Sequence, residues 1–241
     1  MIAAIMQPYL FPYVGYFQLM HAVDTFVFSG DVQYSKNGWI NRNLIRKDDA
    51  AAWLTLPVRK MHLGSLINER HYALDGATLD GAKRLVDSAY ADAPAFDATR
   101  AMLERVWEHG DDNVAGFNAN ALTTIAETLG LGCRFLVSSD IAADPALRSE
   151  ARVMEICRRL GATHYVNAIG GVGLYHAEHF ADAGIELSFL KTSVPMSDLK
   201  EGALHLSIID MLMHAGVSGT GTAMPRYELI APPAGSTVQP A

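Results

Sequence analysis

The chain has few cysteines and no excess of basic charge, and each of these shortages excludes a class of proteins. Cys133 and Cys157 are the two cysteines in 241 residues, too few for a disulfide scaffold and typical of a reducing cytoplasm. Lys and Arg total 19 against 26 Asp and Glu, whereas proteins that bind duplex nucleic acid usually present a basic surface. The composition therefore predicts an acidic cytoplasmic protein with no nucleic-acid partner.

Charge is also missing from the first 23 residues, which contain no Asp, Glu, Lys or Arg. A signal peptide would need a basic start and an uninterrupted apolar core. Here Gln7, Pro8 and Pro12 interrupt the run, and isolated helices in lipid tolerate such breaks poorly. We expect a buried strand, a loop and a helix, and no membrane partner.

The apolar runs predict strands that alternate with helices. Strands are expected at residues 1–6, 25–28, 134–137, 165–168 and 185–190. Helices are expected at residues 13–23, 144–160, 174–183 and 204–215, with Gly216 ending the last one. Strand–helix–strand units join parallel strands through right-handed crossovers. We therefore expect an α/β protein with a largely parallel, Rossmann-like sheet flanked by helices.

Two further segments complete the predicted fold. Residues 51–58 and 66–73 are expected to pair as a β-hairpin around a turn that contains Gly64. Helical periodicity at residues 75–90, 94–109 and 114–129 predicts a helical insertion at about 75–130. The Pro- and Gly-rich residues 231–241 are expected to be a disordered tail. The expected organisation is one α/β domain at residues 1–230.

Ligands of parallel α/β sheets bind in the loops that follow the strands, and the first such loop is rich in aromatic residues. Residues 7–17 read QPYLFPYVGYF and lead into a helix N-terminus, which favours an anion. Packing of these rings in the core is the alternative. The prolines favour a binding loop. The expected ligand contacts are Gln7, Tyr9, Tyr13 and Tyr16.

The loop after the second strand and the segment that follows it are polar. They present Asp31, Gln33, Tyr34, Trp39, Asn41, Arg42 and Asn43. Arg offers a planar charged fork for phosphate or carboxylate, and the flanking amides add donors and acceptors. A capped turn with Arg42 paired to a surface acid is the alternative. We favour binding of a polar ligand, and we expect this segment to face the aromatic loop across one cleft.

Two later loops complete the predicted site. Ser138 and Ser139 follow a strand and either hold a sugar or phosphate or cap the next helix. Tyr165, Gly170, Gly171 and Tyr175 belong to a glycine-rich stretch where backbone can approach a ligand closely. Its spacing is not the dinucleotide fingerprint, and the chain has no P-loop motif. Dehydrogenase and Walker-type NTPase activities are therefore disfavoured, and no cofactor is expected.

The histidines and cysteines carry weaker signals. His176 and His179 lie one helical turn apart, but the sequence places no third ligand beside them. We therefore expect no metal site. Cys157 precedes two arginines in a helix, and nearby cations favour a thiolate. A small buried side chain is the more common role for such a cysteine.

The chain resembles the WbqC-like family of bacterial proteins. The resemblance rests on QPYLFPYVGYF and GWINRN, and on the later stretches SSD, EICRRLGATHYVNAIGGVGLYHAEHF, GIELSFL and LSIIDMLMHAG. These matches run in the same order from about residue 1 to residue 216. The family is associated with gene clusters for O-antigen, other surface polysaccharides and some secondary metabolites. The resemblance implies N-acylation or aminoacylation of an amino sugar. Relatives often carry Tyr and Gln where this chain reads VPMSD at residues 194–198, so the substrate can differ.

The opening strand, loop and helix also resemble those of nucleotidylyl transferases with an HxGH signature. The aligned residues are Tyr13, Val14, Gly15 and Tyr16. The glycine is kept and both imidazoles are absent. The phenols of Tyr13 and Tyr16 take the places of the imidazoles. A phenol has a pKa of about 10 and carries no positive charge that could stabilise a transferring phosphoryl group at neutral pH. The resemblance is therefore one of fold.

The leading hypothesis is an acyl- or aminoacyl-transferase that forms an amide on an amino sugar, preferably a nucleotide-linked one. In it, Asp31 is the base and Cys157 the reserve nucleophile. Arg42 with its two neighbouring asparagines binds phosphate or carboxylate. The expected partners are a small-molecule substrate and, for a carrier-bound donor, an acyl carrier protein. The alternatives are a nucleotide-dependent ligase or nucleotidyltransferase relative, and a noncatalytic partner that binds a sugar nucleotide or a carrier protein.

Overall fold

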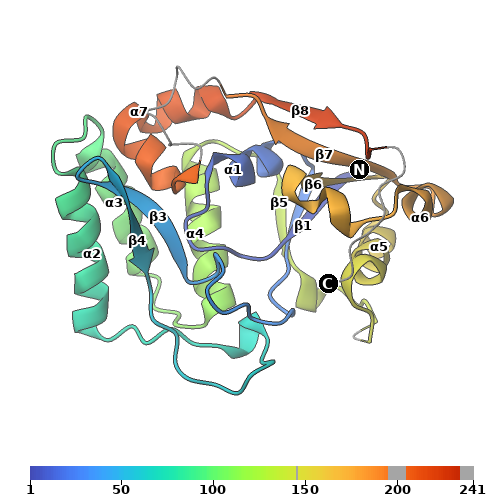
Figure 1. Ribbon diagram of the computed structural model, residues 1–241, viewed down its shortest axis with the longest axis horizontal. Coiled ribbons are helices and arrows are strands. Elements are labelled where there is room, and N and C mark those ends of the chain that lie inside the picture. Colours follow the sequence, from blue (N-terminus) through green and yellow to red (C-terminus); the bar gives the residue numbers. More distant parts are fainter. Residues whose placement is uncertain (145, 195–204, 234–241) are drawn as a thin grey trace.

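A six-stranded sheet forms the centre of the computed structural model, which describes residues 1–144, 146–194 and 205–233 (Figure 1). The strands are β1 (Ile2–Met6), β2 (Thr25–Phe28), β5 (Arg134–Val137), β6 (His164–Ala168), β7 (Glu186–Thr192) and β8 (Tyr227–Ile230). Their order is β5-β2-β1-β6-β7-β8. All neighbouring strands are parallel except β7 and β8. The expected α/β fold with a largely parallel sheet is confirmed.

The register aligns the carboxyl ends of the central strands. Ala3 of β1 pairs with Thr25 of β2 on one side and with Tyr165 of β6 on the other. The loops after these three strands therefore start at the same edge of the sheet. Ala3 and Ala4 are fully buried, as expected for a central strand covered on both faces.

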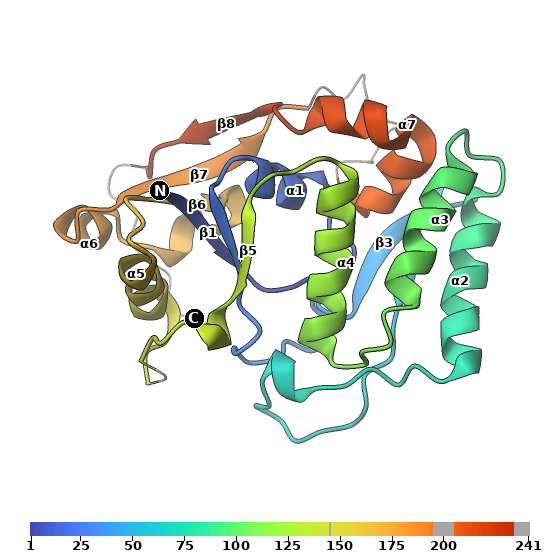
Figure 2. The ribbon, with the colours of Figure 1, turned by 180° about the vertical axis from the view of Figure 1, so that it is seen from behind.

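Side chains of successive strand residues point to opposite faces, and each face carries its own hydrophobic cluster. On one face, Ala4, Phe26 and Val166 pack with helix α1 (Val14–His21) and with the helical segments beyond it. On the other face, Ala3 and Tyr165 pack with α5 (Ser149–Leu160) and α6 (Ala177–Asp182). The sheet is thus the middle of three layers (Figure 2).

Three helices occupy the segment where helical periodicity was found: α2 (Gly76–Tyr90), α3 (Phe96–Trp107) and α4 (Val114–Thr128). Asp75 caps α2 by accepting a hydrogen bond from Thr78 N, and Asn113 caps α4 by accepting one from Gly116 N. A separate antiparallel hairpin of β3 (Arg42–Lys47) and β4 (Ala50–Thr55) lies beside α2 (Figure 1).

The expected partner of residues 51–58 was wrong. The strand β4 pairs with β3, whereas residues 66–73 contain a short 3-10 helix, η1 (Ile67–Glu69), and meet residues 57–59 only through an isolated bridge of Val58 with Tyr72 and adjacent backbone bonds. The tight turn at Asp48 and Asp49, both with positive φ, favours the local hairpin. It also places Arg42 and Asn43 on a strand instead of a loop.

Three predicted helices have different bounds. The helix expected at 144–160 begins at Ser149, since Asp144 forms a turn by accepting from Ala146 N, at 2.8 Å. Residues 169–174 form a separate 3-10 helix, η3 (Ile169–Leu174), before α6. Helix α7 (Ile208–Ala223) consists of two helical segments separated at Gly216, whose φ of 64° and ψ of −176° are not helical, so the first segment ends at the predicted glycine and a second segment follows it.

Some expectations concern residues that the structure does not describe. Pro145, most of the stretch that departs from the family pattern after Val194, and most of the expected tail lie outside the described residues. Strand β8, which precedes the tail, was not expected from the sequence. No helix in the described part of the chain is long and apolar enough to cross a membrane.

Candidate functional site

The loops that follow β1, β2 and β6 enclose a cavity of about 610 Å³ together with the start of α5. This volume is within the usual range for small-molecule sites, about 300–1,000 Å³. Seven of the predicted site residues line it: Gln7, Tyr9, Tyr13, Trp39, Gly170, Gly171 and Tyr175. The wall also contains Ile5, Met6, Ser29, Val32, Ser149, Glu150, Arg152, Val153, Ile156, Asn167, Ala168 and Leu174.

A smaller cavity of about 170 Å³ adjoins the larger one. Tyr9, Tyr13 and Trp39 line both. Pro12, Asn43 and His205 complete the smaller wall. Burial raises the pKa of Tyr9 and Tyr13, so both phenols are neutral hydrogen-bonding groups at physiological pH. The three rings separate two compartments of one site.

Tyr16 belongs to the support of this site and not to its surface. Its side chain is 1% exposed, and its hydroxyl donates a hydrogen bond of 2.7 Å to the carbonyl of Gln7. Its ring packs beside those of Tyr9 and Phe26, with centroids 5.9 and 5.4 Å away. The alternative of a packed core ring describes Tyr16, whereas Tyr9 and Tyr13 line the cavity.

Hydrogen bonds connect the aromatic loop to the segment that begins at Trp39. Leu10 N donates to Trp39 O at 3.1 Å, and Asn43 Nδ2 donates to Leu10 O at 3.0 Å. Asn118 of α4, which is fully buried, donates from Nδ2 to Pro8 O and to Ile40 O at 2.8 and 2.7 Å. The structure therefore brings the two predicted clusters side by side.

Arg42 is beside this site but lines neither cavity. Its guanidinium lies over the ring of Trp53, 4.2 Å from the centroid, and donates to the carbonyls of Asn37 and Gly38. The shared cleft that we expected thus includes Trp39 and Asn43 and leaves out the Arg42 fork. The reason is local: Arg42 begins β3, and its neighbouring Trp53 on β4 offers a cation–π partner.

The other predicted residues of this segment make internal contacts. Tyr34 donates from its hydroxyl to Asn41 Oδ1 at 2.8 Å, and Asn41 Nδ2 donates to Leu56 O at 2.9 Å. Arg70 covers the Tyr34 ring at 4.4 Å. Gln33 is exposed and forms an isolated bridge with Leu66. These residues hold the chain between β2 and η1 in place, and none of them lines a described cavity.

Asp31 forms a nearly buried ion pair with Arg152 of α5. The two side chains are 15% and 10% exposed. Asp31 also accepts a hydrogen bond from the Ser138 hydroxyl, and Arg152 Nη1 donates to Asp144 O at 3.2 Å. Arg152, not Asp31, lines the larger cavity. Paired and hydrogen-bonded in this way, the Asp31 carboxylate fixes Arg152 against the cavity wall.

Two more predicted residues lie away from the cavities. Cys157 is fully buried in the core between the sheet and α5, and burial raises its pKa to about 12. A thiol of this kind stays protonated and unreactive. Ser139 is exposed, and its hydroxyl is 3.4 Å from Asp140 in the 3-10 helix η2 (Ser138–Asp140).

The glycine-rich loop approaches Asn167 closely. A Cβ on Gly171 would lie 2.8 Å from Asn167 Nδ2, so any larger residue here would displace the Asn167 amide. The same Nδ2 donates to the Tyr175 hydroxyl at 2.9 Å, and Tyr165, fully buried, places its hydroxyl 3.2 Å from that of Tyr175. Burial raises the pKa of both tyrosines. Tyr165 therefore supports the wall that Tyr175 and Asn167 form.

Glu150 and Arg152 are the charged residues of the larger cavity wall, and neither was expected there from the sequence. Both lie near the start of α5, where charged residues usually indicate a solvated helix face. Because Glu150 and Arg152 do not directly follow a strand of the sheet, their position beside the loops after β1, β2 and β6 could not be inferred from the sequence. The HxxH pair at His176 was the available signal, because Glu150 contacts both of its histidines.

These features define the class: an α/β protein with a ligand-sized, aromatic and polar cavity at the carboxyl edge of a parallel sheet, where such folds bind ligands. The chain belongs to the WbqC-like protein family, whose model matches residues 7–221. It is 29% identical over 222 residues to the uncharacterized protein Rv1507c of Mycobacterium tuberculosis (strain ATCC 25618 / H37Rv), covering 88% of this chain and 93% of that protein. No solved structure matches the chain.

Proposed function

We propose that the protein is an acyl- or aminoacyl-transferase that forms an amide on an amino sugar, preferably a nucleotide-linked one. The observation that carries the proposal is the cavity of about 610 Å³, whose wall combines aromatic rings, amides and one guanidinium. Such a wall suits a sugar nucleotide, since rings cover sugar and base faces while amides and cations bind hydroxyls and phosphates.

The acceptor would occupy the larger cavity. Gln7 and Asn167 offer amide groups to the hydroxyls of the sugar. Arg152 offers a guanidinium to the phosphates of the nucleotide. The smaller cavity behind Tyr9 and Tyr13 is more apolar and is the proposed place of the acyl chain. This division assigns one compartment to each substrate.

The transfer in this proposal is direct. The amine nitrogen of the acceptor attacks the thioester carbonyl of the donor, a C–N bond forms, the C–S bond breaks, and the amine proton goes to the departing thiolate. The proposed step forms no covalent intermediate on Cys157, because this thiol is buried and its pKa is raised to about 12. Asp31 serves to position Arg152 through their ion pair.

The experiment is a mass-spectrometric assay of nucleotide-linked amino sugars incubated with acyl- and aminoacyl-thioesters, free and carrier-bound. The proposal predicts acceptor products that are heavier by one acyl group. Tyr13→Ala should lose this activity. Tyr227→Ala should keep it, because Tyr227 is also half-buried but lines neither cavity. If none of the acceptors in the panel gains an acyl group, the proposed transferase activity is contradicted.

A noncatalytic sugar-nucleotide-binding protein is the second candidate. The observation that favours it is that the Asp31 carboxylate, the predicted base, is engaged by Arg152 and Ser138 and does not line the larger cavity. This candidate predicts that calorimetry detects binding of the same acceptors and that Tyr13→Ala abolishes this binding. It also predicts that no acylated product forms in the assay.

A further inference from the structure

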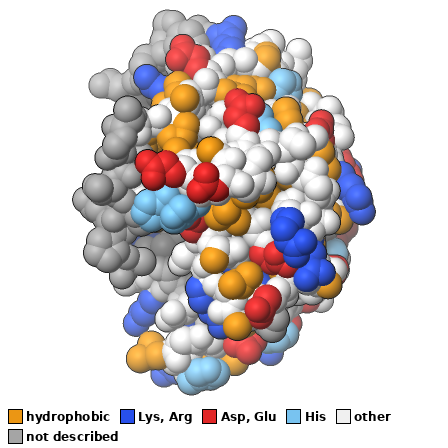
Figure 3. Space-filling view, turned by 90° about the vertical axis from the view of Figure 1, so that its right-hand side faces the viewer, with side chains coloured by type: hydrophobic (Ala, Val, Ile, Leu, Met, Phe, Trp, Pro, Cys, Tyr) orange, Lys and Arg blue, Asp and Glu red, His pale blue; other side chains and the backbone are white. Residues whose placement is uncertain are grey.

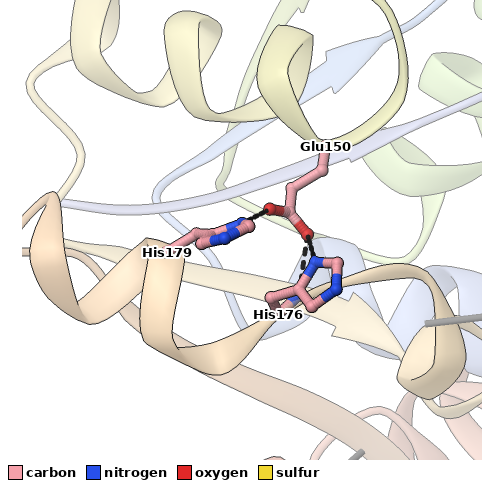
Figure 4. Close-up of side chains that lie close together, drawn as sticks. All are labelled: Glu150, His176 and His179. Atoms are coloured by element: carbon pink, nitrogen blue, oxygen red, sulfur yellow. Dashed lines mark hydrogen bonds and ion pairs between the residues drawn. The ribbon is translucent and has the colours of Figure 1, made fainter. Parts of the chain in front are cut away.

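Glu150, His176 and His179 form a cluster at the rim of the larger cavity. Glu150 is in the first turn of α5, His176 is the residue that precedes α6, and His179 lies within α6. One ligand atom from each residue can be chosen so that all three lie within 4.8 Å of one another. Histidine and acidic side chains lie together on the face that carries these helices (Figure 3), and the three side chains converge (Figure 4).

The carboxylate of Glu150 is held by three donors. Its Oε2 accepts from the backbone N of His176 at 2.7 Å and lies 3.0 Å from His176 Nδ1, while Oε1 accepts from His179 Nδ1. The two imidazole rings are 4.6 Å apart between centroids. The backbone bond fixes the carboxylate independently of the rings, so the cluster is built by the fold and not by the chance approach of long side chains.

We propose that these three residues bind one divalent transition-metal ion of the zinc class. Imidazole nitrogen and carboxylate oxygen are the ligands such ions prefer. Ligand atoms at about 2.0–2.2 Å from one ion lie roughly 3–4 Å apart, close to the His176–Glu150 separation of 3.0 Å. The ion would replace the protons that now join the imidazoles to the carboxylate.

The position of the cluster leaves coordination places open. Glu150 lines the cavity with its side chain 14% exposed, whereas His176 and His179 are 44% and 56% exposed. Three protein ligands plus open positions are typical of zinc sites that bind a substrate or water, while structural zinc sites use four protein ligands. The ion would therefore contact a ligand in the cavity. This inference goes beyond the proposed transferase, which needs no metal.

The test uses the full chain without a histidine tag, depleted of metal by dialysis against a chelator. Zinc chloride alone is the probe, and binding is followed by calorimetry and by elemental analysis of the dialysed protein. We expect one zinc ion per chain. Glu150→Gln, His176→Ala and His179→Ala should each weaken binding by at least about tenfold, because each removes one of three ligands.

The matched control is His71→Ala. His71 is 45% exposed and also contacts a carboxylate, Asp112, at 2.7 Å, but it belongs to no group of three metal-ligating side chains among the described residues. This variant should bind zinc as the wild type does. A loss of affinity equal to that of the ligand variants would show scattered surface binding and overturn the proposal.

Two measurements keep the result interpretable if a variant is unstable. Circular dichroism reports whether each variant folds, and His179→Ala removes a largely exposed side chain, so it should fold. Cobalt(II) bound to the wild type should give visible absorption bands that His179→Ala lacks. Zinc binding by folded His179→Ala that equals the wild type would contradict the site, whatever the outcome of the transferase assay.

Discussion

The two sides of the cavity use their polar side chains differently. On the side of the β3–β4 hairpin, Tyr34, Asn41 and Arg42 satisfy one another, their backbone neighbours and Trp53. On the side of α5, Glu150 and Arg152 line the cavity itself. A polar cluster in the sequence can therefore have a structural role, and charged residues that line a cavity can lie in a helix that has no distinctive sequence motif. Substitutions on each side test this difference.

The largest effect should come from Asp31→Ala. The change leaves the Arg152 guanidinium nearly buried without its counter-charge, and an uncompensated buried charge costs about 3–5 kcal/mol of unfolding free energy. Urea unfolding measures it. The double variant Asp31→Leu with Arg152→Met should recover most of the loss, since it removes both charges. A small loss in the single variant would show that the pair is not held as the structure has it.

The Gly171→Ala substitution should have the next largest effect on the free energy of unfolding. Its Cβ would lie 2.8 Å from Asn167 Nδ2, and such overpacking costs about 1–3 kcal/mol. The adjacent Gly170 also lines the cavity, but a Cβ there has nothing within 4 Å. Gly170→Ala should thus unfold at the same denaturant concentration as the wild type. Equal losses in the two variants would refute the close approach to Asn167.

Arg42→Ala should have a smaller effect on stability, about 1 kcal/mol or less, because it removes a cation–π contact with the exposed Trp53. It should leave acceptor binding unchanged. Trp39→Ala should weaken acceptor binding, because Trp39 lines both cavities. Calorimetry with a nucleotide-linked amino sugar compares the two, and loss of binding in Arg42→Ala would move the ligand towards the hairpin.

A further effect is a dependence of stability on pH through Cys157. Burial raises the pKa of this thiol from 9.0 to about 12, so between these values the unfolded chain has lost the proton that the folded chain keeps. This contribution is present below pH 9 and decreases as the pH rises. Cys157→Ala should therefore lose less stability than the wild type between pH 8 and pH 10 in urea unfolding. Parallel pH profiles would show that the thiol is not buried in this way.

The sequence was sufficient for the five parallel strands of the sheet, because these are short apolar runs bounded by clear helix and turn signals, whereas the antiparallel strand β8 was not expected. The strands at 25–28 and 134–137 have the predicted bounds. Local patterns also indicated the aromatic loop that lines the cavity. The pairing of β3 with β4 was missed because β3 is a polar strand, RNLIRK, in which only Asn43 and Ile45 are buried.

The charged part of the site could not be predicted for a different reason. Glu150 meets His176 and His179 through tertiary packing of two helices that are separated in the chain by β6 and η3. Similarly, Asp31 pairs with a residue 121 positions away. Hydrophobic periodicity predicts which face of a helix is buried, but it does not specify which polar residue at the helix end meets which loop.

The central claim is that the cavity between the aromatic loop and α5 holds the acceptor. A crystal structure of the protein with a nucleotide-linked amino sugar tests this most directly. We expect ligand density against Tyr13, Trp39 and Arg152, with the hairpin guanidinium of Arg42 still on Trp53. Density bound at Arg42, with both cavities empty, would contradict it.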